Sequence, residues 1–217
     1  MAGRRRTIGD TRQGDETVAV QVLPGPPSRP ASSVPIAPLP VAAPRAPLVV
    51  PLLVDAAVAV AMGVYGRMHT PTGIAVNVAG FSSPQAVKVW LGSGAAAFAV
   101  VQLLSALAMW GRLGDFSPSW AGTVHRWSGR IAFLLTVPVA VHCLYALGFA
   151  DHDLRTLTHS LLGCLFFGAF STKMLALPRP GLAGWVLPVV GGVVFTVLMG
   201  VWLTSSLWYF TTFRVGT

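Results

Sequence analysis

The chain has 217 residues, of which 53% are hydrophobic and only 10% are charged, and its formal net charge is +8. An average soluble domain carries about 25% charged residues, and a soluble domain of this size needs far more surface charge to stay in solution. The composition therefore excludes most soluble folds and favours a multi-spanning protein of the lipid bilayer. Because the arginines are scattered at the ends of apolar segments and form no basic face with stacking aromatics, the charge does not indicate nucleic-acid binding.

Residues 1–47 differ in composition from the rest of the chain. They hold nine of the 17 prolines and six of the arginines. A segment of this kind cannot bury enough apolar surface to offset its ordering entropy. We therefore expect 1–47 to be a disordered, Pro/Ala/Arg-rich cytoplasmic tail whose charge holds the N-terminus inside the cell.

Five apolar stretches follow, each long enough to cross a hydrocarbon core of about 30 Å. With the N-terminus inside, eleven Lys and Arg residues fall on the cytoplasmic side and four on the other side, as the positive-inside rule requires. The predicted fold is all-α: a polytopic membrane helical bundle of five transmembrane helices over 48–210, N-in and C-out, in the plasma membrane, with a short extracytoplasmic C-terminus at 211–217. The expected spans are residues 48–68, 86–111, 124–150, 156–177 and 184–210.

Polar and small residues within these spans carry further expectations. Ionisable groups at membrane depth are costly, so each is a functional candidate. Asp55 lies about one turn into the first span, and we expect it to pair with Arg130 or to hydrogen-bond with Gln102. Small residues such as Gly92 on the second span and Gly191 on the fifth are expected to let helices approach closely.

His142 and His159 carry the main functional signal. At 1.5 Å per residue, His142 lies about 12 Å and His159 about 5 Å below the outer boundary, on either side of the tight hairpin 151–155. Two imidazoles that face each other across a helix bundle are a recurrent way to hold haem iron from both sides. The alternative is that both histidines only hydrogen-bond between helices.

Neighbouring residues suit a haem pocket. Gly163 lies one turn after His159 on the same face and would clear space for a flat macrocycle, while Phe166 and Phe170 continue that face and would wall it. Pro138, four residues before His142, frees a backbone carbonyl and is expected to kink the third span.

The segment from His125 to Arg130 lies at the inner end of the third span. His125 is about 100° from His142 around the helix, and no other span offers a histidine at its depth, so we do not expect a second haem there. His125, Arg126 and Arg130 are candidates to hold a haem propionate or a quinone head group. Alternatively, they anchor the helix at the interface and contact lipid head groups.

Two stretches resemble known haem proteins. Residues 125–149, HRWSGRIAFLLTVPVAVHCLYALGF, resemble a span of the ferric-reductase-like transmembrane haem domains, in which a haem-binding His is followed by a Tyr, as His142 is by Tyr145. Residues 158–170, THSLLGCLFFGAF, resemble the His-Ser-x-x-Gly element of cytochrome b561-type proteins. Over about 50–210 the chain also resembles a family of uncharacterised five-span bacterial membrane proteins. Since the second and fifth spans carry no histidine, the two-haem arrangement of the b561-type proteins is not expected.

The sequence thus predicts a b-type membrane cytochrome with one haem, held by His142 and His159. It would carry electrons between the quinone pool or a membrane dehydrogenase and an extracytoplasmic carrier, with the haem supplying the redox chemistry. The main alternative is a non-catalytic integral-membrane subunit with structural histidines. A small transporter is a weaker alternative because inverted repeats are missing. The sequence shows no Ser-His-Asp set, no metal cluster and no phosphate loop, so hydrolytic catalysis has no support.

Overall fold

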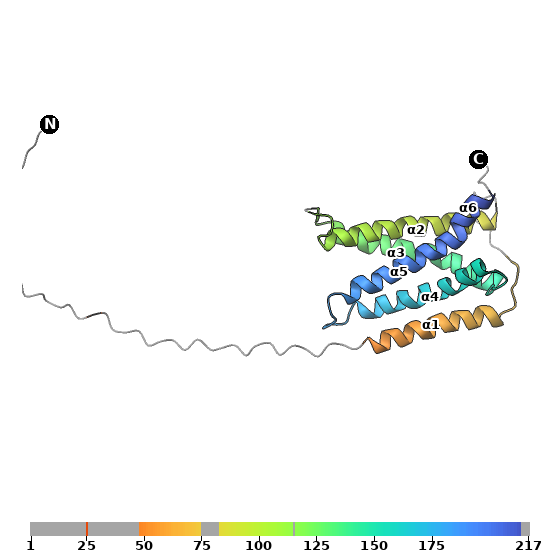
Figure 1. The fold of residues 1–217 in the computed structure, drawn as a ribbon, viewed down its shortest axis with the longest axis horizontal. Helices are drawn as coiled ribbons and strands as arrows, with labels where there is room; N and C mark the ends of the chain where they lie inside the picture. Colours follow the sequence, from red (N-terminus) through yellow and green to blue (C-terminus); the bar gives the residue numbers. More distant parts are fainter. Residues whose placement is uncertain (1–24, 26–47, 75–82, 115, 214–217) are drawn as a thin grey trace, which may run out of the picture. The chain divides into compact units, whose positions relative to one another are not determined.

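The computed structural model describes residues 25, 48–74, 83–114 and 116–213. In these residues α3 continues without a break into the π-helical turn η1, and α5 continues into the π-helical turn η2 and the short α6, so there are five helical segments and no strand (Figure 1). The expected tail at 1–47 lies outside the described residues apart from Gly25, and so do the last four residues. The elements are α1 (Val49–Met68), α2 (Pro84–Met109), α3 (Ala121–Val141), η1 (His142–Leu147), α4 (Leu154–Ala176), α5 (Val186–Trp202), η2 (Leu203–Leu207) and α6 (Trp208–Phe213).

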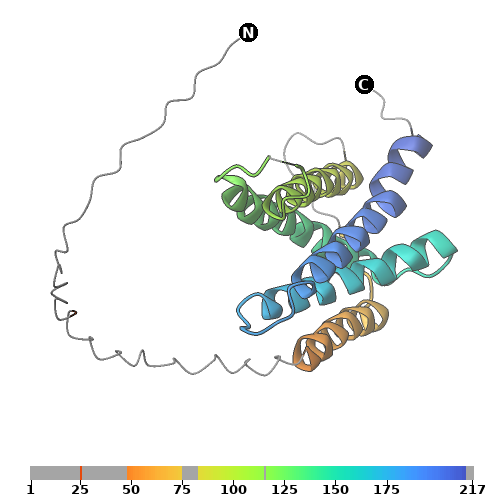
Figure 2. The ribbon, with the colours of Figure 1, turned by 60° about the vertical axis from the view of Figure 1, so that its left-hand side comes forward.

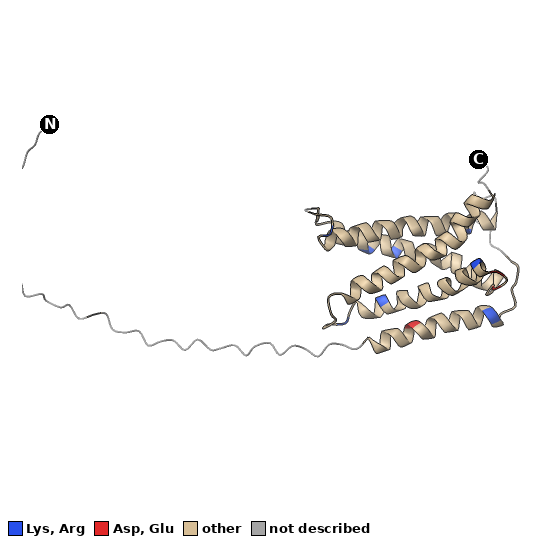
Figure 3. Ribbon diagram, in the orientation of Figure 1, with Lys and Arg blue, Asp and Glu red and all other residues tan. Residues whose placement is uncertain are grey.

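Four of the five segments are long and apolar enough to cross a membrane: α1, α2, α3 with η1, and α5 with η2 and α6. Charged residues are sparse along them (Figure 3). Large apolar side chains point outward, for example Leu53, 64% exposed, and Leu134, 65% exposed, as expected for helices that face lipid. The all-helical prediction is confirmed for the described residues, and the helix ends fall within about three residues of the expected spans.

The fourth expected span is α4, which is not among those four helices. Its sequence is more polar because it carries hydroxyl, histidine and lysine side chains along its length. It packs between α1 and α5, as both ribbon views show (Figures 1 and 2). One of its hydroxyls, Thr172 Oγ1, donates to the carbonyl of Pro51 in α1 at 3.0 Å. The interior of the bundle therefore accommodates the polarity of α4.

Local signals explain where the helices begin and end. At the start of α2, Ser83 Oγ accepts a hydrogen bond from the N–H of Ala86, and Pro84 occupies the first helical position, both common at a helix N-terminus. Gly148 ends η1 with φ of +72°, which glycine adopts without strain. A Cβ on Gly148 would also lie only 3.0 Å from the carbonyl oxygen of Gly66.

The helices pack in two groups, α2 with α3 and α4 with α1 and α5. Close approach depends on glycine, as expected for Gly92: a Cβ there would lie 2.9 Å from Ser206 Oγ of η2. The same expectation is wrong for Gly191 and its neighbour Gly192, because a Cβ on either would meet nothing within 4 Å. Phe133 of α3 stacks on Phe170 of α4 with ring centroids 4.0 Å apart, which joins the two groups near the middle of the bundle.

The third span differs from its prediction in one respect. We expected a helix that continues to residue 150, kinked at Pro138. Instead, the helix changes to π geometry at His142, four residues after Pro138, and ends at Leu147. The C-terminal part of α5 makes the same change at Leu203. π-helical turns are rare and occur often at functional sites.

Candidate functional site

A cavity of about 290 Å³ lies between α2, α3 with η1, α4 and α5 with η2. It is at the end of the bundle where residues 148–153 connect η1 to α4, which we call the hairpin end. Its walls are mostly apolar, with Phe166, Phe167, Leu198 and Trp202 among the lining residues. The volume is at the lower end of the range of about 300–1,000 Å³ for small-molecule sites. Protein interiors are otherwise close-packed, so a space of this size between four helices is a candidate ligand site.

Both π-helical turns contribute to this cavity, η1 through Cys143 and Leu144 and η2 through Ser205 and Ser206. A π turn takes carbonyl groups out of the regular α-helical pattern, and those carbonyls need other donors. The N–H of Thr72 donates to the Tyr145 carbonyl at 3.3 Å. In η2, the Thr204 carbonyl accepts from Arg155 at 2.8 Å. Side chains and a loop therefore hold both turns in place around the cavity.

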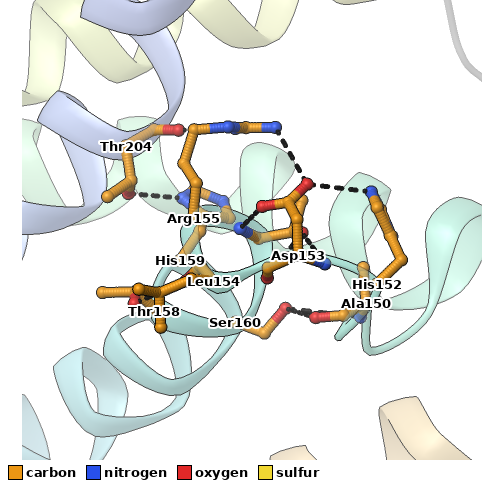
Figure 4. A network of polar contacts seen from close by, with 10 residues as sticks. Ala150, His152, Asp153, Leu154, Arg155, Thr158, His159, Ser160 and Thr204 are labelled. Carbon is orange, nitrogen blue, oxygen red and sulfur yellow. Dashed lines mark hydrogen bonds and ion pairs between the residues drawn. The ribbon is translucent and has the colours of Figure 1, made fainter.

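His159 lines the cavity, and its tautomer follows from its partner (Figure 4). Its Nδ1 lies 3.1 Å from Thr204 Oγ1, while that hydroxyl lies 2.8 Å from the carbonyl oxygen of Gly200. A carbonyl can only accept, so the hydroxyl proton of Thr204 goes to Gly200 and Nδ1 of His159 must be the donor to Oγ1. Nε2 then carries a lone pair. The imidazole also makes a hydrogen bond with the backbone of Val201. His159 is thus prepared to act as an acceptor or as a metal ligand.

Arg155, one turn before His159, is fixed on three sides. Its guanidinium donates to the Thr204 carbonyl, lies 3.8 Å above the ring centroid of Trp208 and is 4.0 Å from Asp153 Oδ2. Figure 4 shows Arg155 with Thr204, Asp153 and His152, and Nε2 of His152 lies 3.3 Å from the same carboxylate. The Arg155 side chain therefore has a defined position at the hairpin end of the cavity.

Asp153 connects this cluster to the start of α4. It is the N-cap residue: its Oδ1 accepts a hydrogen bond of 2.8 Å from the Thr156 N–H, and the Thr156 hydroxyl accepts from the N–H of Asp153 at 3.3 Å. This reciprocal pair is a capping box. The Thr156 backbone N–H is the main reason why the pKa of the exposed Asp153 carboxyl lies below its usual range, with Arg155 and His152 lowering it further.

Lys88 of α2 also lines the cavity, and it differs from Arg155 in having no hydrogen bond or ion pair within the described residues. It lies close enough to interact electrostatically with three side chains: His142, Cys143 and His159. Among the described lining residues the only charged ones are Lys88 and Arg155, and none is acidic. The cavity is therefore electropositive at one end and apolar elsewhere.

The structure places the two predicted haem ligands differently. His159 is on the cavity wall, whereas His142 is not among the lining residues although its neighbours Cys143 and Leu144 are. Successive residues of a helix point about 100° apart, so the face of η1 that presents Cys143 to the cavity turns His142 away from it. His142 instead begins η1.

Of the predicted wall residues, Gly163 and Phe166 line the cavity and Phe170 does not. A Cβ on Gly163 would meet nothing within 4 Å, so space is present there as expected. Phe170 stacks on Phe133 and belongs to the packing next to the cavity.

The segment with His125, Arg126 and Arg130 lies outside the cavity lining, near the N-terminal end of α3. Nδ1 of His125 donates to the carbonyl of Gln102 at 3.0 Å, and the Gln102 side-chain amide donates back to the His125 carbonyl at 3.1 Å. Arg126 donates to Thr123, and Arg130 lies 5.2 Å from the ring centroid of Trp127. These contacts link α2 to α3 and anchor the start of the helix.

Asp55 does not make the expected pairs. Gln102 bonds to His125 and Arg130 lies over Trp127, while Oδ1 of Asp55 is buried with no hydrogen-bond partner. It faces Gly168 of α4, where an added Cβ would overlap with it. The prediction failed because α1 packs on α4, and α2 and α3 pair with each other.

Comparison with protein families gives one match, over residues 48–217, to a family described as "Family of unknown function (DUF6529)". The chain belongs to this family. The match covers every described helix of this DUF6529 protein. No curated protein and no solved structure matches.

Three residues of the site were missed by sequence reasoning: Lys88, Arg155 and Thr204. The two cations were counted only as charges that set the topology, and Thr204 was not considered. One signal was present for Lys88, since Gln85, Lys88 and Gly92 recur at helical spacing on one face of α2, and all three line the cavity.

Proposed function

We propose that this DUF6529 protein is a five-span protein of the plasma membrane, N-in and C-out, with α4 as the fifth span. The presence of four helices that are long and apolar enough to cross a membrane supports a lipid bilayer as the environment of the protein. α4 packs against α1 and α5, and its polar side chains are buried or half-buried, so this helix can share the depth of its neighbours with those groups turned partly away from lipid. In this orientation the hairpin end faces the extracytoplasmic side.

For the cavity we propose a b-type haem, with His159 as its primary axial ligand. The observation that carries the proposal is the state of His159: Thr204 fixes Nδ1 as the donor, and Nε2 with its lone pair belongs to a side chain on the wall of a cavity. A ligating histidine usually donates its other ring N–H to a neighbouring acceptor, which sets the tautomer and the ring orientation. The resemblance of residues 125–149 and 158–170 to transmembrane haem domains points to the same group.

The residues present fit a haem in three respects. Nε2 of His159 is the donor atom that haem iron takes. Phe166, Phe167 and Leu198 offer apolar walls, and Gly163 leaves space beside them. A bound haem would supply one-electron redox chemistry. The protein would hold the ligand, orient the imidazole and exclude water.

His142 is the proposed second ligand, as the sequence predicts, and its position is the most demanding part of the proposal. It begins η1, next to two lining residues, so its side chain must turn toward the cavity to serve as a ligand. Electrons would pass between quinone or a membrane dehydrogenase and an extracytoplasmic redox protein.

The decisive experiment is a spectrum of the full-length protein purified in detergent. We expect a Soret band, an α-band in the reduced-minus-oxidised spectrum and about one haem per chain. His159→Ala should abolish these bands, and His142→Ala should convert a low-spin spectrum to a high-spin one. The matched control is His152→Ala, because His152 is 71% exposed and lies outside the cavity lining.

Each contrary result has a defined meaning. Absence of haem from a well-folded wild-type protein would contradict the proposal and favour a non-catalytic membrane subunit. A haem signal that persists undiminished in His159→Ala would contradict the assignment of the ligand. An unchanged low-spin spectrum in His142→Ala would remove His142 from the site.

A further inference from the structure

The electrostatics of the cavity specify its ligand more closely than the histidine does. Lys88 and Arg155 are the charged residues of the described lining, both are cations, and no acidic residue accompanies them. A charge taken out of water is costly unless it is paired. The Asp153 carboxylate lies 4.0 Å from Arg155, but among the described residues no carboxylate accompanies Lys88.

The two cations are not equivalent. Arg155 is already held by the Thr204 carbonyl, the Trp208 ring and the Asp153 carboxylate. Lys88 is half-buried and has neither a hydrogen bond nor an ion pair with any residue that the structure describes. It lies among His142, Cys143 and His159, none of which carries a fixed negative charge. An ammonium group has three donors and no acceptor. Of the two cations on the cavity wall, Lys88 is therefore the one that lacks a counter-ion among the described residues.

We propose that Lys88 binds an acidic group, a carboxylate, of the ligand that occupies the cavity. The inference rests on the proposed function in taking this cavity as the ligand site, but it concerns the charge of the ligand and not its iron. A ligand of this class is an amphiphile: the carboxylate meets Lys88 at the hairpin end, and the apolar body lies against Phe166, Phe167 and Leu198. Haem propionates and the head group of an acidic lipid share this chemistry.

The test compares acid and ester forms of the same body, with the full-length protein in detergent. Metal-free protoporphyrin IX and its dimethyl ester form one pair, and oleate and methyl oleate form the other. A hydrogen bond to a charged group contributes about 1.5–3 kcal/mol, so we expect the acid of one pair to bind about tenfold or more tightly than its ester. Lys88→Met should remove this preference and leave the affinity for the ester unchanged.

Two variants keep the result interpretable. Lys88→Arg retains the charge and should retain the preference for the acid, which separates loss of charge from loss of folding. Lys173→Met removes the chain's other lysine, which is also half-buried but does not line the cavity, and it should leave the preference intact.

The outcomes separate this inference from the haem proposal. Metal-free porphyrin has no iron, so its binding does not depend on axial ligation by His159. A Lys88-dependent preference for oleate alone would support the inference and identify an acidic lipid as the occupant, against haem. A preference for protoporphyrin would support both. Equal binding of acid and ester in both pairs, or a preference that survives Lys88→Met, would overturn the inference whatever the haem content.

Discussion

Thr204 of η2 accepts a hydrogen bond from the imidazole of His159 in α4, with 3.1 Å between Oγ1 and Nδ1. The two residues come from different helices, and the carbonyl of the same threonine accepts from Arg155. A single residue of a π-helical turn, Thr204, thus positions the side chains of both His159 and Arg155 at the cavity.

This relationship leads to a prediction for the variant Thr204→Val, because valine has a shape similar to that of threonine but lacks the hydroxyl. Loss of a hydrogen bond that orients a ligating histidine weakens metal sites by about 10–100-fold, so we expect haem affinity to fall by that order while the protein still folds. Haem titration of the haem-free protein measures the change. Thr204→Ser keeps the acceptor and should bind as the wild type does. Equal affinities of the valine and serine variants would show that the hydroxyl has no part in ligation.

A second prediction concerns the contact between Gly168 and Asp55. A methyl group at residue 168 would overlap with Oδ1 and with the backbone carbonyl of Asp55. Overpacking of this kind costs about 1–3 kcal/mol, so Gly168→Ala should lower the unfolding temperature in detergent and loosen the packing of α1 on α4. Gly191→Ala is the control, because a Cβ there meets nothing within 4 Å. If both variants unfolded at the same temperature, the close approach of α1 and α4 would be in doubt.

The N-cap of α4 predicts a dependence of stability on pH. The pKa of Asp153 is lowered in the folded protein, mainly by the Thr156 N–H. A lowered folded-state pKa means that the contribution of Asp153 is fully present above its unfolded pKa of about 3.9 and is lost as pH falls through the folded value. Thermal unfolding measured from about pH 6 down to about pH 3, a range that brackets that pKa, should show this loss of stability. Asp153→Asn still caps but does not titrate, so its acid-induced loss should be smaller. An identical pH profile would exclude Asp153 as its source.

A fourth prediction separates His125 from the proposed haem site. Its imidazole donates to the Gln102 carbonyl and does not line the cavity. His125→Ala should therefore reduce stability by about 0.6 kcal/mol, the average for hydrogen bonds between membrane helices, and by no more than about 1.7 kcal/mol, the largest value found for them. The haem content per folded chain should stay at the wild-type value in the pyridine haemochrome assay. A loss of haem without a loss of stability would return His125 to the list of cofactor-binding residues.

The proposed orientation can be tested by labelling with a membrane-impermeant maleimide in intact cells. In a background without Cys143 and Cys164, we expect a cysteine in place of the exposed His152 to react. A cysteine in place of Ala183, in the loop between α4 and α5, should react only after lysis. The reverse pattern would invert the topology, and reaction of both in intact cells would contradict α4 as a span.

The sequence predicts the helices well because hydropathy and length record which segments leave water. It predicts the cavity less well because the face that a residue presents depends on helix geometry. Cys143 lines the cavity, whereas His142, one residue earlier, does not. Asp55 was assigned partners on α2 and α3 because hydropathy contains no information about which helices are neighbours. Lys88 was read only as a topology signal, since no property of the sequence shows that a lysine lacks a counter-ion.

The polarity of α4 has a consequence for how the protein is made. A translocating segment enters the bilayer on its own only if its hydrophobicity outweighs its polar groups, and α4 falls short of the apolarity of the other four helices. It packs against both α1 and α5, and its hydroxyl, imidazole and amine groups are buried or half-buried in the bundle. If α4 is a span, as proposed, it would be held at the insertion machinery until α5, which is synthesised after it, emerges. Biogenesis should therefore be cooperative, and a chain truncated before α5 should fail to retain α4 in the membrane.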